Sequence, residues 1–358
     1  MRRFIAIMVV ALAATTTLYA QQPVKNIIYM IGDGMGITTV SMMQLENMYE
    51  PTIFDRAENI ALQKSYSLNN RVTDSAASGT ALATGGKTNN AMLGVTPDGV
   101  ALKSIMECAK EQGMATGVVV TTYLQHATPA AFYAHIDSRN KYVEISQQLA
   151  DSRLDVAIGG GMGHFCKLYG DEPSVVAALA ERDFTVVRTM EALSSQTGDE
   201  RVLALVADYE VPSDAVGYLA NATSEALRLL EARDDDNGFV LMVEGSLIDG
   251  KGHANDAEAQ QIEMQGFMQA VEVAVAYAES HPDTLVVVTA DHGTGGLTLI
   301  SADADFMLAE QGVEYHWATK GHSGEMVPIY LYGAGAELIN GIMENADLGG
   351  RLKQIVQY

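Results

Sequence analysis

The stretch NIIYMIGDG, residues 26–34, joins an apolar run to a Gly-Asp-Gly turn, and runs of this kind decide the fold. Asn26–Ile31 is apolar almost throughout rather than at alternate positions, which is typical of a strand buried on both faces of a sheet. Seven further stretches share this character: Ala115–Thr121, Asp155–Ile158, Phe184–Val187, Val202–Val206, Phe239–Val243, Thr284–Thr289 and Pro328–Tyr332. We therefore predict a sheet with both faces covered.

Helical patterns lie between these predicted strands. They are Leu102–Glu111, Pro129–Ile136, Ser174–Glu181, Ser224–Ala232 and a long one over Ala257–Glu279. This alternation predicts an α/β fold, a three-layer sandwich with a large, mostly parallel central sheet and helices on both faces. Because no linker or repeat divides residues 21–358, we expect a single domain, with a short crown- or lid-like insertion around residues 297–320.

Residues 1–20 are typical of a signal peptide. Arg2 and Arg3 precede the apolar run Phe4–Ala14, and Leu18-Tyr19-Ala20 offers a cleavage site. The apolar run is too short for a permanent membrane anchor, and no Cys follows Ala20 as in a lipoprotein. We predict a soluble protein that is periplasmic or secreted, with no membrane anchor after signal removal.

The chain is strongly acidic, with 22 basic and 45 acidic residues and a formal net charge of −23. This balance excludes nucleic-acid binding through a basic surface. It also repels anionic substrates, so a site for phosphate would need local cations. Cys108 lies in a helical pattern and Cys166 in a Gly-rich stretch that reads as a loop; their spacing leaves open whether they pair.

A reactive serine is indicated by VTDSAASGT, residues 72–80. Ser75 follows Asp74 and is then surrounded by very small residues, which leave room for a substrate. The Ala-rich continuation favours helix, so Ser75 is expected at a helix N-terminus, where backbone N–H groups attract anions.

Polar residues follow three of the predicted strands, and ligands bind beyond the carboxyl ends of strands in open α/β sheets. These residues are Asp33, Glu244, Asp249, His253, Asp291 and His292. Each fragment alone is weak evidence. GDGMG resembles a dinucleotide-binding loop, but the third glycine of that motif would fall on Ile37, and an Asp would repel pyrophosphate. Asp249 and His253 could equally be a helix-capping acid and a surface histidine.

The remaining histidines fall into two groups. His322 lies in a Gly-rich polar context, as His253 and His292 do, whereas His135, His164, His281 and His316 read as surface or structural residues. Arg139 follows a helical pattern and has the planar guanidinium that suits two phosphate oxygens, although an isolated Arg is more often a surface ion-pair residue.

Together these pieces resemble the alkaline phosphatase family. VTDSAASGT fits that family's nucleophile signature, and the other matching motifs are NIIYMIGDGMG (26–36), HATPAAFYAHIDSR (126–139), VEGSLIDGKGH (243–253), VTADHG (288–293) and KGHSGE (320–325). The resemblance covers essentially all of residues 21–358. It implies a phosphomonoesterase with a phosphoserine intermediate, broad specificity for small phosphate monoesters and a homodimeric state.

The resemblance also implies the roles of individual residues. Ser75 would be the nucleophile, and Arg139, with Asp74 beside it, would bind the substrate phosphate. Two zinc ions and one magnesium ion are implied: Asp249, His253 and His322 for the first zinc; Asp33, Asp291 and His292 for the second, with Ser75 on its substrate side; and Asp33, Thr128 and Glu244 for magnesium. These donor types agree with zinc and with a hard cation, respectively.

The sequence departs from the family pattern at two positions. His126 stands where an Asp often binds the magnesium through water, and an imidazole there favours zinc or cobalt in the third site. Gly250 stands where relatives often carry Lys, His or Trp; Lys251 is shifted by one position. Two other functions stay open: a phosphodiesterase or sulfatase of the same superfamily, and a non-catalytic phosphate- or metal-binding protein.

Overall fold

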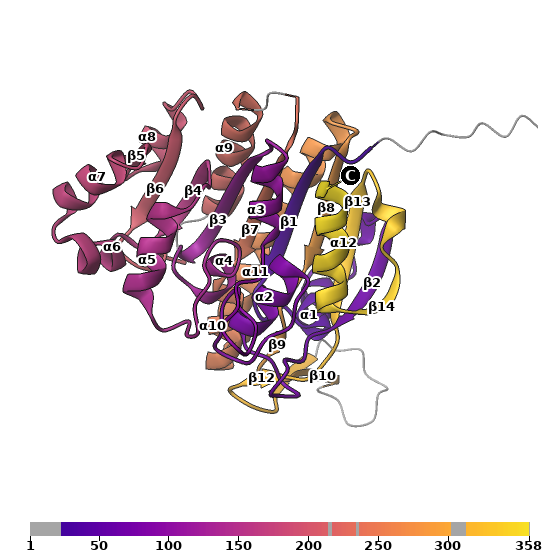
Figure 1. Ribbon diagram of the computed structural model, residues 1–358. Coiled ribbons are helices and arrows are strands. Elements are labelled where there is room, and N and C mark those ends of the chain that lie inside the picture. The colour runs from indigo at the N-terminus through magenta and orange to yellow at the C-terminus, as the bar shows by residue number, and fades with distance from the viewer. Residues whose placement is uncertain (1–22, 214–216, 234–235, 302–312, 358) are drawn as a thin grey trace, which may run out of the picture.

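The computed structural model describes residues 23–213, 217–233, 236–301 and 313–357, so the predicted signal peptide lies outside the described residues. A ten-stranded sheet runs through the molecule (Figure 1). Its order is β14 (Gly341–Glu344), β2 (Asn59–Lys64), β13 (Val327–Gly333), β8 (Thr284–Thr289), β1 (Asn26–Gly32), β7 (Phe239–Gly245), β3 (Ala115–Tyr123), β4 (Val156–Gly160), β6 (Arg201–Ala207) and β5 (Phe184–Val187). Within it β13 alone runs antiparallel to its neighbours.

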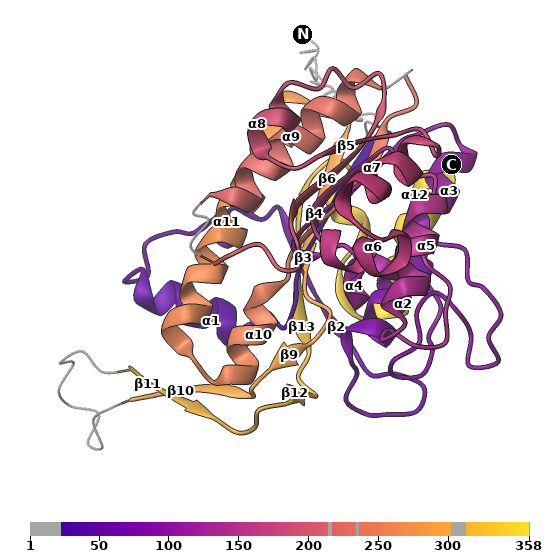
Figure 2. The same cartoon turned by 90° about the vertical axis from the view of Figure 1, so that its left-hand side faces the viewer.

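Helices cover both faces of the sheet, as the edge-on view shows (Figure 2). One face carries α1 (Ile37–Glu46), α8 (Met190–Ser194), α9 (Tyr218–Ala232), α10 (Leu247–Ala254) and α11 (Ala257–Ser280). The other carries α2 (Ser75–Thr84), α3 (Ile105–Glu111), α4 (Ala127–Ala130), α5 (Tyr142–Asp151), α6 (Met162–Tyr169), α7 (Glu172–Ala180) and α12 (Asn345–Gln357). Short 3₁₀ turns span Ile53–Arg56 and Ala336–Leu338. The predicted three-layer α/β sandwich is therefore confirmed.

Strand register brings three polar turns together. β1 pairs in parallel with β7 on one side and β8 on the other, with Ile31 opposite both Glu244 and Thr289. All seven residues of β1 are buried, which explains its continuous apolar character. The residues that follow β1, β7 and β8 consequently emerge at the same edge of the sheet, side by side.

Beyond β8 the chain forms smaller elements at this edge. β9 (Gly293–Thr294) pairs antiparallel with β12 (His322–Ser323), and β10 (Leu297–Ser301) pairs with β11 (Val313–Trp317). Only the β10–β11 pair lies within residues 297–320, where the sequence predicts an insertion. Among the described residues, no helix is both long and apolar enough to cross a bilayer.

Some local expectations are wrong. The helix predicted over Pro129–Ile136 is the single turn α4, because the chain then leaves to pair Ile136 with Leu93, 2.8 and 2.9 Å between their backbone atoms. Cys166 lies in α6 rather than in a loop. Cys108 and Cys166 are free thiols. The strands β2 and β14, at one end of the sheet, were not predicted, since their exposed positions break the apolar run.

The core between α11 and the sheet offers a test of packing. Phe267 is fully buried, and a Cβ added to Gly245 of β7 would lie 2.8 Å from its ring. We expect Phe267→Ala to lower the free energy of unfolding by about 3–5 kcal/mol through lost burial and a cavity. The control Ile262→Ala, on the exposed side of α11, should change it by less than about 0.5 kcal/mol. Urea unfolding of both variants measures this; a similar loss for both would contradict the assigned packing.

Candidate active site and metal centre

Ser75 begins helix α2, as the sequence predicts. Asp74 is the N-cap: its Oδ1 accepts a hydrogen bond from the Ala77 N–H at 3.0 Å, which satisfies one free donor of the first turn. The other carboxylate oxygen accepts from the Ala91 N–H at 3.0 Å and from Arg139 Nη1 at 3.3 Å. Asp74 therefore links the guanidinium of Arg139 to the start of α2, the helix that begins with Ser75.

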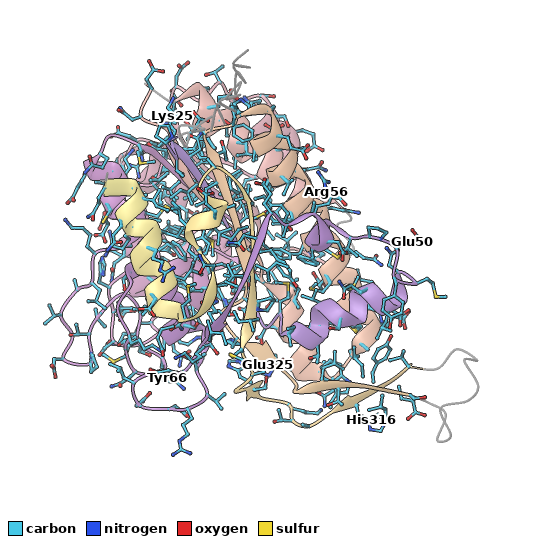
Figure 3. All side chains as sticks on the ribbon, turned by 90° about the vertical axis from the view of Figure 1, so that its right-hand side faces the viewer. Lys25, Glu50, Arg56, Tyr66, His316 and Glu325 are labelled. Atoms are coloured by element: carbon cyan, nitrogen blue, oxygen red, sulfur yellow. The ribbon has the colours of Figure 1, made fainter. Side chains whose placement is uncertain are left out.

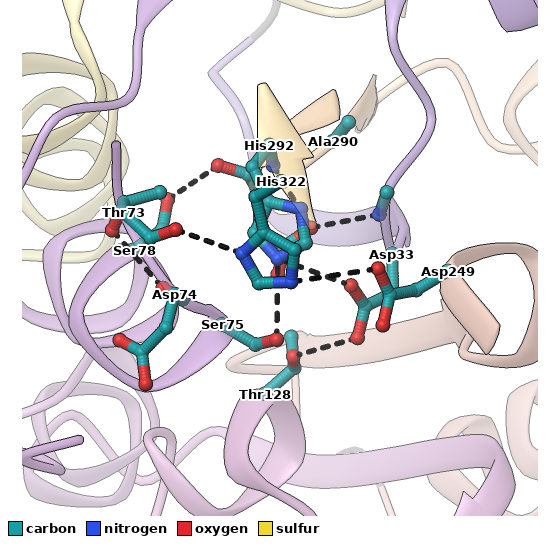
Figure 4. Close-up of polar contacts among 12 residues, drawn as sticks. Asp33, Thr73, Asp74, Ser75, Ser78, Thr128, Asp249, Ala290, His292 and His322 are labelled. Carbon is teal, nitrogen blue, oxygen red and sulfur yellow. Dashed lines mark hydrogen bonds and ion pairs between the residues drawn. The ribbon is translucent and has the colours of Figure 1, made fainter. Parts of the chain in front are cut away.

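The Ser75 hydroxyl faces the turn after β8 (Figure 4). Its Oγ lies 3.2 Å from His292 Nε2. The same ring nitrogen is 3.2 Å from Asp291 Oδ2 and 3.5 Å from Asp33 Oδ1, and all three side chains are completely buried. Asp33, Asp291 and His292 form one group of potential metal ligands.

A second group lies beside the first. Asp249 and His253 are one turn apart on α10, with 3.2 Å between Oδ2 and Nε2, so the four-residue spacing does place them on one helix face. His322 Nε2, from β12, is 3.2 Å from His253 Nε2 and 3.7 Å from Asp249 Oδ1. The His322 ring also stacks on His292 at 3.6 Å between centroids, so the two groups are adjacent.

A third group contains Asp33, His126 and Glu244. Thr128 Oγ1 approaches it, 3.5 Å from Asp33 Oδ2. His126 precedes α4, and its Nε2 lies 3.1 Å from Arg139 Nη2. Burial, and then the Arg139 cation, lower the pKa of His126 to about 3. The imidazole is therefore neutral near pH 7 and has a lone pair available for a metal ion.

Buried atoms without partners show that these residues fit cations. Five buried atoms here have no hydrogen-bond partner: Asp33 Oδ1, both carboxylate oxygens of Glu244, Asp291 Oδ2 and His126 Nδ1. Burial, and then repulsion from neighbouring carboxylates, raise the pKa of Asp33 well above its usual value, that of Asp291 to about 7 and that of Glu244 to about 8. Divalent cations would supply both the missing partners and the missing charge.

The sequence-predicted site residues come together at one edge of the sheet. The histidines predicted to lie outside the site have structural surroundings: His135 pairs with Glu107, His281 with Glu231, His316 with Glu314, and His164 packs among tyrosines. Burial raises the pKa of Glu263 on α11, and the nearby charge of Lys251 opposes part of this rise. Two residues from Asp249 on a helix, Lys251 belongs to a different face.

Sequence reasoning missed several residues that hold the ligand-bearing turns. Ser78 Oγ donates to the Asp291 carbonyl at 2.7 Å and accepts from Asn345 Nδ2 at 3.0 Å. Gln63 Nε2 donates to the Ala290 carbonyl at 2.7 Å. The Thr294 hydroxyl donates to Asp249 Oδ1. Ser78, within the serine motif, and Thr294, directly after VTADHG, had a nearby sequence feature that could have revealed them.

Comparisons with known proteins agree with this geometry. The family model described as alkaline phosphatase matches residues 24–311. Alkaline phosphatase 3 of Bacillus subtilis is 31% identical, over 94% of this chain and 90% of its own length. Streptomycin-6-phosphate phosphatase of Streptomyces griseus is 30% identical, over 92% of this chain and 89% of its own.

Solved structures give the same result. The alkaline phosphatase of the Antarctic bacterium TAB5 superimposes with a TM-score of 0.86 at 34% identity, covering 94% of this chain and 99% of that one. A His-to-Asp mutant of TAB5 alkaline phosphatase, with Mg bound in its M3 site, gives a TM-score of 0.85. The match extends over nearly the whole length of both chains. This chain belongs to the alkaline phosphatase family.

Proposed function

We propose that this protein hydrolyses phosphate monoesters to an alcohol and inorganic phosphate through a phosphoserine intermediate on Ser75. The observation that carries the proposal is the position of the Ser75 hydroxyl, at a helix N-terminus and 3.2 Å from His292 within a buried set of metal-ligand side chains. One relative is named for its action on streptomycin-6-phosphate, which supports an organic phosphate substrate.

The donor sets support two zinc ions and a third divalent cation. Asp249, His253 and His322 would hold the first zinc, and Asp33, Asp291 and His292 the second, because mixed carboxylate and imidazole ligands suit zinc. Asp33, Thr128 and Glu244 would hold magnesium through oxygen atoms. His126 in the same group makes zinc or cobalt an alternative there. A mutant of the TAB5 enzyme in which a histidine became aspartate has magnesium bound in its M3 site.

The proposed reaction has two steps, the attack of Ser75 on phosphorus and the hydrolysis of the phosphoserine. Divalent ions, when bound, make a nearby hydroxyl a better nucleophile and offset negative charge on phosphoryl oxygens. Ser75 Oγ would attack phosphorus in line, and its bond to phosphorus would form as the ester P–O bond breaks. The proton lost by the Ser75 hydroxyl equals the proton gained by the departing alkoxide, so phosphoserine and an alcohol result. Water then cleaves the phosphoserine, which returns the Ser75 hydroxyl and releases phosphate.

Arg139 would bind two phosphoryl oxygens, and Asp74 would orient it. Asp74 joins the start of α2 to the guanidinium, since one oxygen accepts from the Ala77 N–H and the other from Arg139 Nη1. This arrangement supports substrate positioning for Asp74 rather than proton transfer from Ser75. Our proposal further includes a single domain, broad specificity, a homodimer, and export of the chain to the periplasm or medium after signal removal.

Substitution of the nucleophile tests the covalent step. We expect Ser75→Ala to lower turnover by about three orders of magnitude or more and to abolish attachment of labelled phosphate. Ser78→Ala is the matched control: its hydroxyl is already bonded to the Asp291 carbonyl, so labelling should persist. Acid-quenched protein incubated with a ³²P-labelled monoester gives the readout. Label on the Ser75→Ala protein would show that another residue is the nucleophile.

Metal removal tests the centre. Chelation should abolish activity, because it removes the positive charge that would activate the Ser75 hydroxyl and offset the charge of the phosphoryl oxygens. Re-addition of zinc should restore turnover, and magnesium or cobalt should raise it further through the third group. Elemental analysis should find three ions per chain. Full activity in protein shown to be metal-free would contradict the proposal.

Gly250 tests phosphate release. It is exposed on α10, and nothing lies within 4 Å of an added Cβ, so a side chain fits. We expect Gly250→Lys to lower the inhibition constant of inorganic phosphate about fivefold, since an ion pair near the surface is worth about 1 kcal/mol. Gly250→Ala adds bulk without charge and should leave the constant unchanged. Equal inhibition of the wild type and the Lys variant would show that this position does not face the phosphate.

A further inference from the structure

Glu325 lies outside the three metal groups, yet its carboxylate contacts the segments that carry them. It follows β12 by two residues, and its Oε1 accepts a hydrogen bond from Ser323 Oγ at 2.8 Å. The same carboxylate lies beside Gly36, the residue that precedes α1. Glu325 therefore contacts the turn before α1 from a distant part of the chain.

Two glycines make room for this carboxylate. A Cβ added to Gly36 or to Gly293 would lie 2.7 Å from Glu325 Cδ and closer still to Oε1. At Gly36 the three nearest atoms all belong to Glu325. The φ angle of Gly36 is −63°, which any residue can adopt. An alanine at position 36 would therefore displace the Glu325 carboxylate without straining its own backbone.

Each contact of Glu325 is close in sequence to a metal ligand. Gly36 follows Asp33 by three residues, Gly293 directly follows His292, and Glu325 itself follows His322 by three. Figure 3 shows Glu325 at the same end of the molecule as His316 of β11 and opposite Lys25, which precedes β1. One carboxylate thus joins three chain segments at the edge of the sheet where the metal groups lie.

We propose that Glu325 is a positioning residue that fixes Asp33, His292 and His322 relative to one another and so sets the metal affinity of the centre. The inference rests on the proposed metal sites, but not on catalysis. Groups that orient metal ligands typically change metal affinity about 10- to 100-fold when removed. Without its carboxylate, the Ser323 hydroxyl loses its acceptor and the space beside Gly36 and Gly293 is left empty, so the three segments are no longer joined.

Zinc affinity of the metal-free protein, measured by competition with a chromogenic chelator, tests this role. We expect Glu325→Ala to weaken zinc binding about 10- to 100-fold. Glu325→Gln keeps the size and one acceptor oxygen, so its affinity should stay within about threefold of the wild type. Asp171→Ala is the matched control: it removes the carboxylate that caps α7, through Ser174 N–H at 3.1 Å, and should lower the melting temperature without changing zinc affinity.

A double variant tests the packing itself. Gly36→Ala alone should weaken zinc binding as Glu325→Ala does, because its methyl group displaces the carboxylate. In Glu325→Ala the space is empty, so adding Gly36→Ala should cause no further loss. Circular dichroism and gel filtration of each metal-free variant verify folding.

The possible results separate this role from the proposed function. Wild-type protein that binds no zinc would refute the metal sites. Zinc binding by the wild type with unchanged affinity in Glu325→Ala would refute only the role of Glu325, as would additive losses in the double variant. Should Glu325→Ala not fold, Glu325→Gln and Gly36→Ala decide: retention in the first with loss in the second supports the proposal, and any other pattern overturns it.

Discussion

The centre depends on one electrostatic constraint, the burial of Asp33, Glu244 and Asp291 beside one another. Three carboxylates in a medium of low dielectric repel strongly, and the protein alone relieves this only by holding protons, as their raised pKa values show. Adjacent strands enforce the arrangement, because β7, β1 and β8 deliver these residues to the same edge. The fold therefore creates a demand for positive charge before any substrate arrives.

The need for cations at this edge explains how an acidic protein could bind an anionic substrate. The overall charge of −23 would repel phosphate, whereas the proposed cations at the sheet edge and the guanidinium of Arg139 would reverse the local field. Hydrogen bonds hold the side chains around this site in place. Asp74 ties Arg139 to the start of α2, and Ser78 ties the same helix to the Asp291 carbonyl. Positive charge would favour an anionic ligand, and these hydrogen bonds would determine where it binds.

Much of this could be predicted from the sequence, because buried parallel strands leave a clear pattern. All eight predicted strands exist, and the polar residues after β1, β7 and β8 could be assigned to one edge from topology alone. The helix predicted over Pro129–Ile136 failed because the Ile136–Leu93 pairing is a long-range contact that local propensity does not encode. Asn345 and Gln63 were missed for a similar reason, because their side chains bond to residues distant in sequence and no spacing reveals them. Glu325 lies within the KGHSGE motif, but its contacts beside Gly36 and Gly293 are likewise long-range.

Asp33 belongs to two of the three ligand groups, and this makes the groups thermodynamically dependent. An ion in one group withdraws charge from a carboxylate that the other group also uses. Linkage then requires that the effect be reciprocal: whatever the first ion does to the affinity for the second, the second does to the first. A change in the third group, such as an imidazole from His126 in place of a harder ligand, would therefore alter the affinity for an ion beside Ser75. In the proposed centre, metal preference would be a property of all three groups together, because two of them share Asp33.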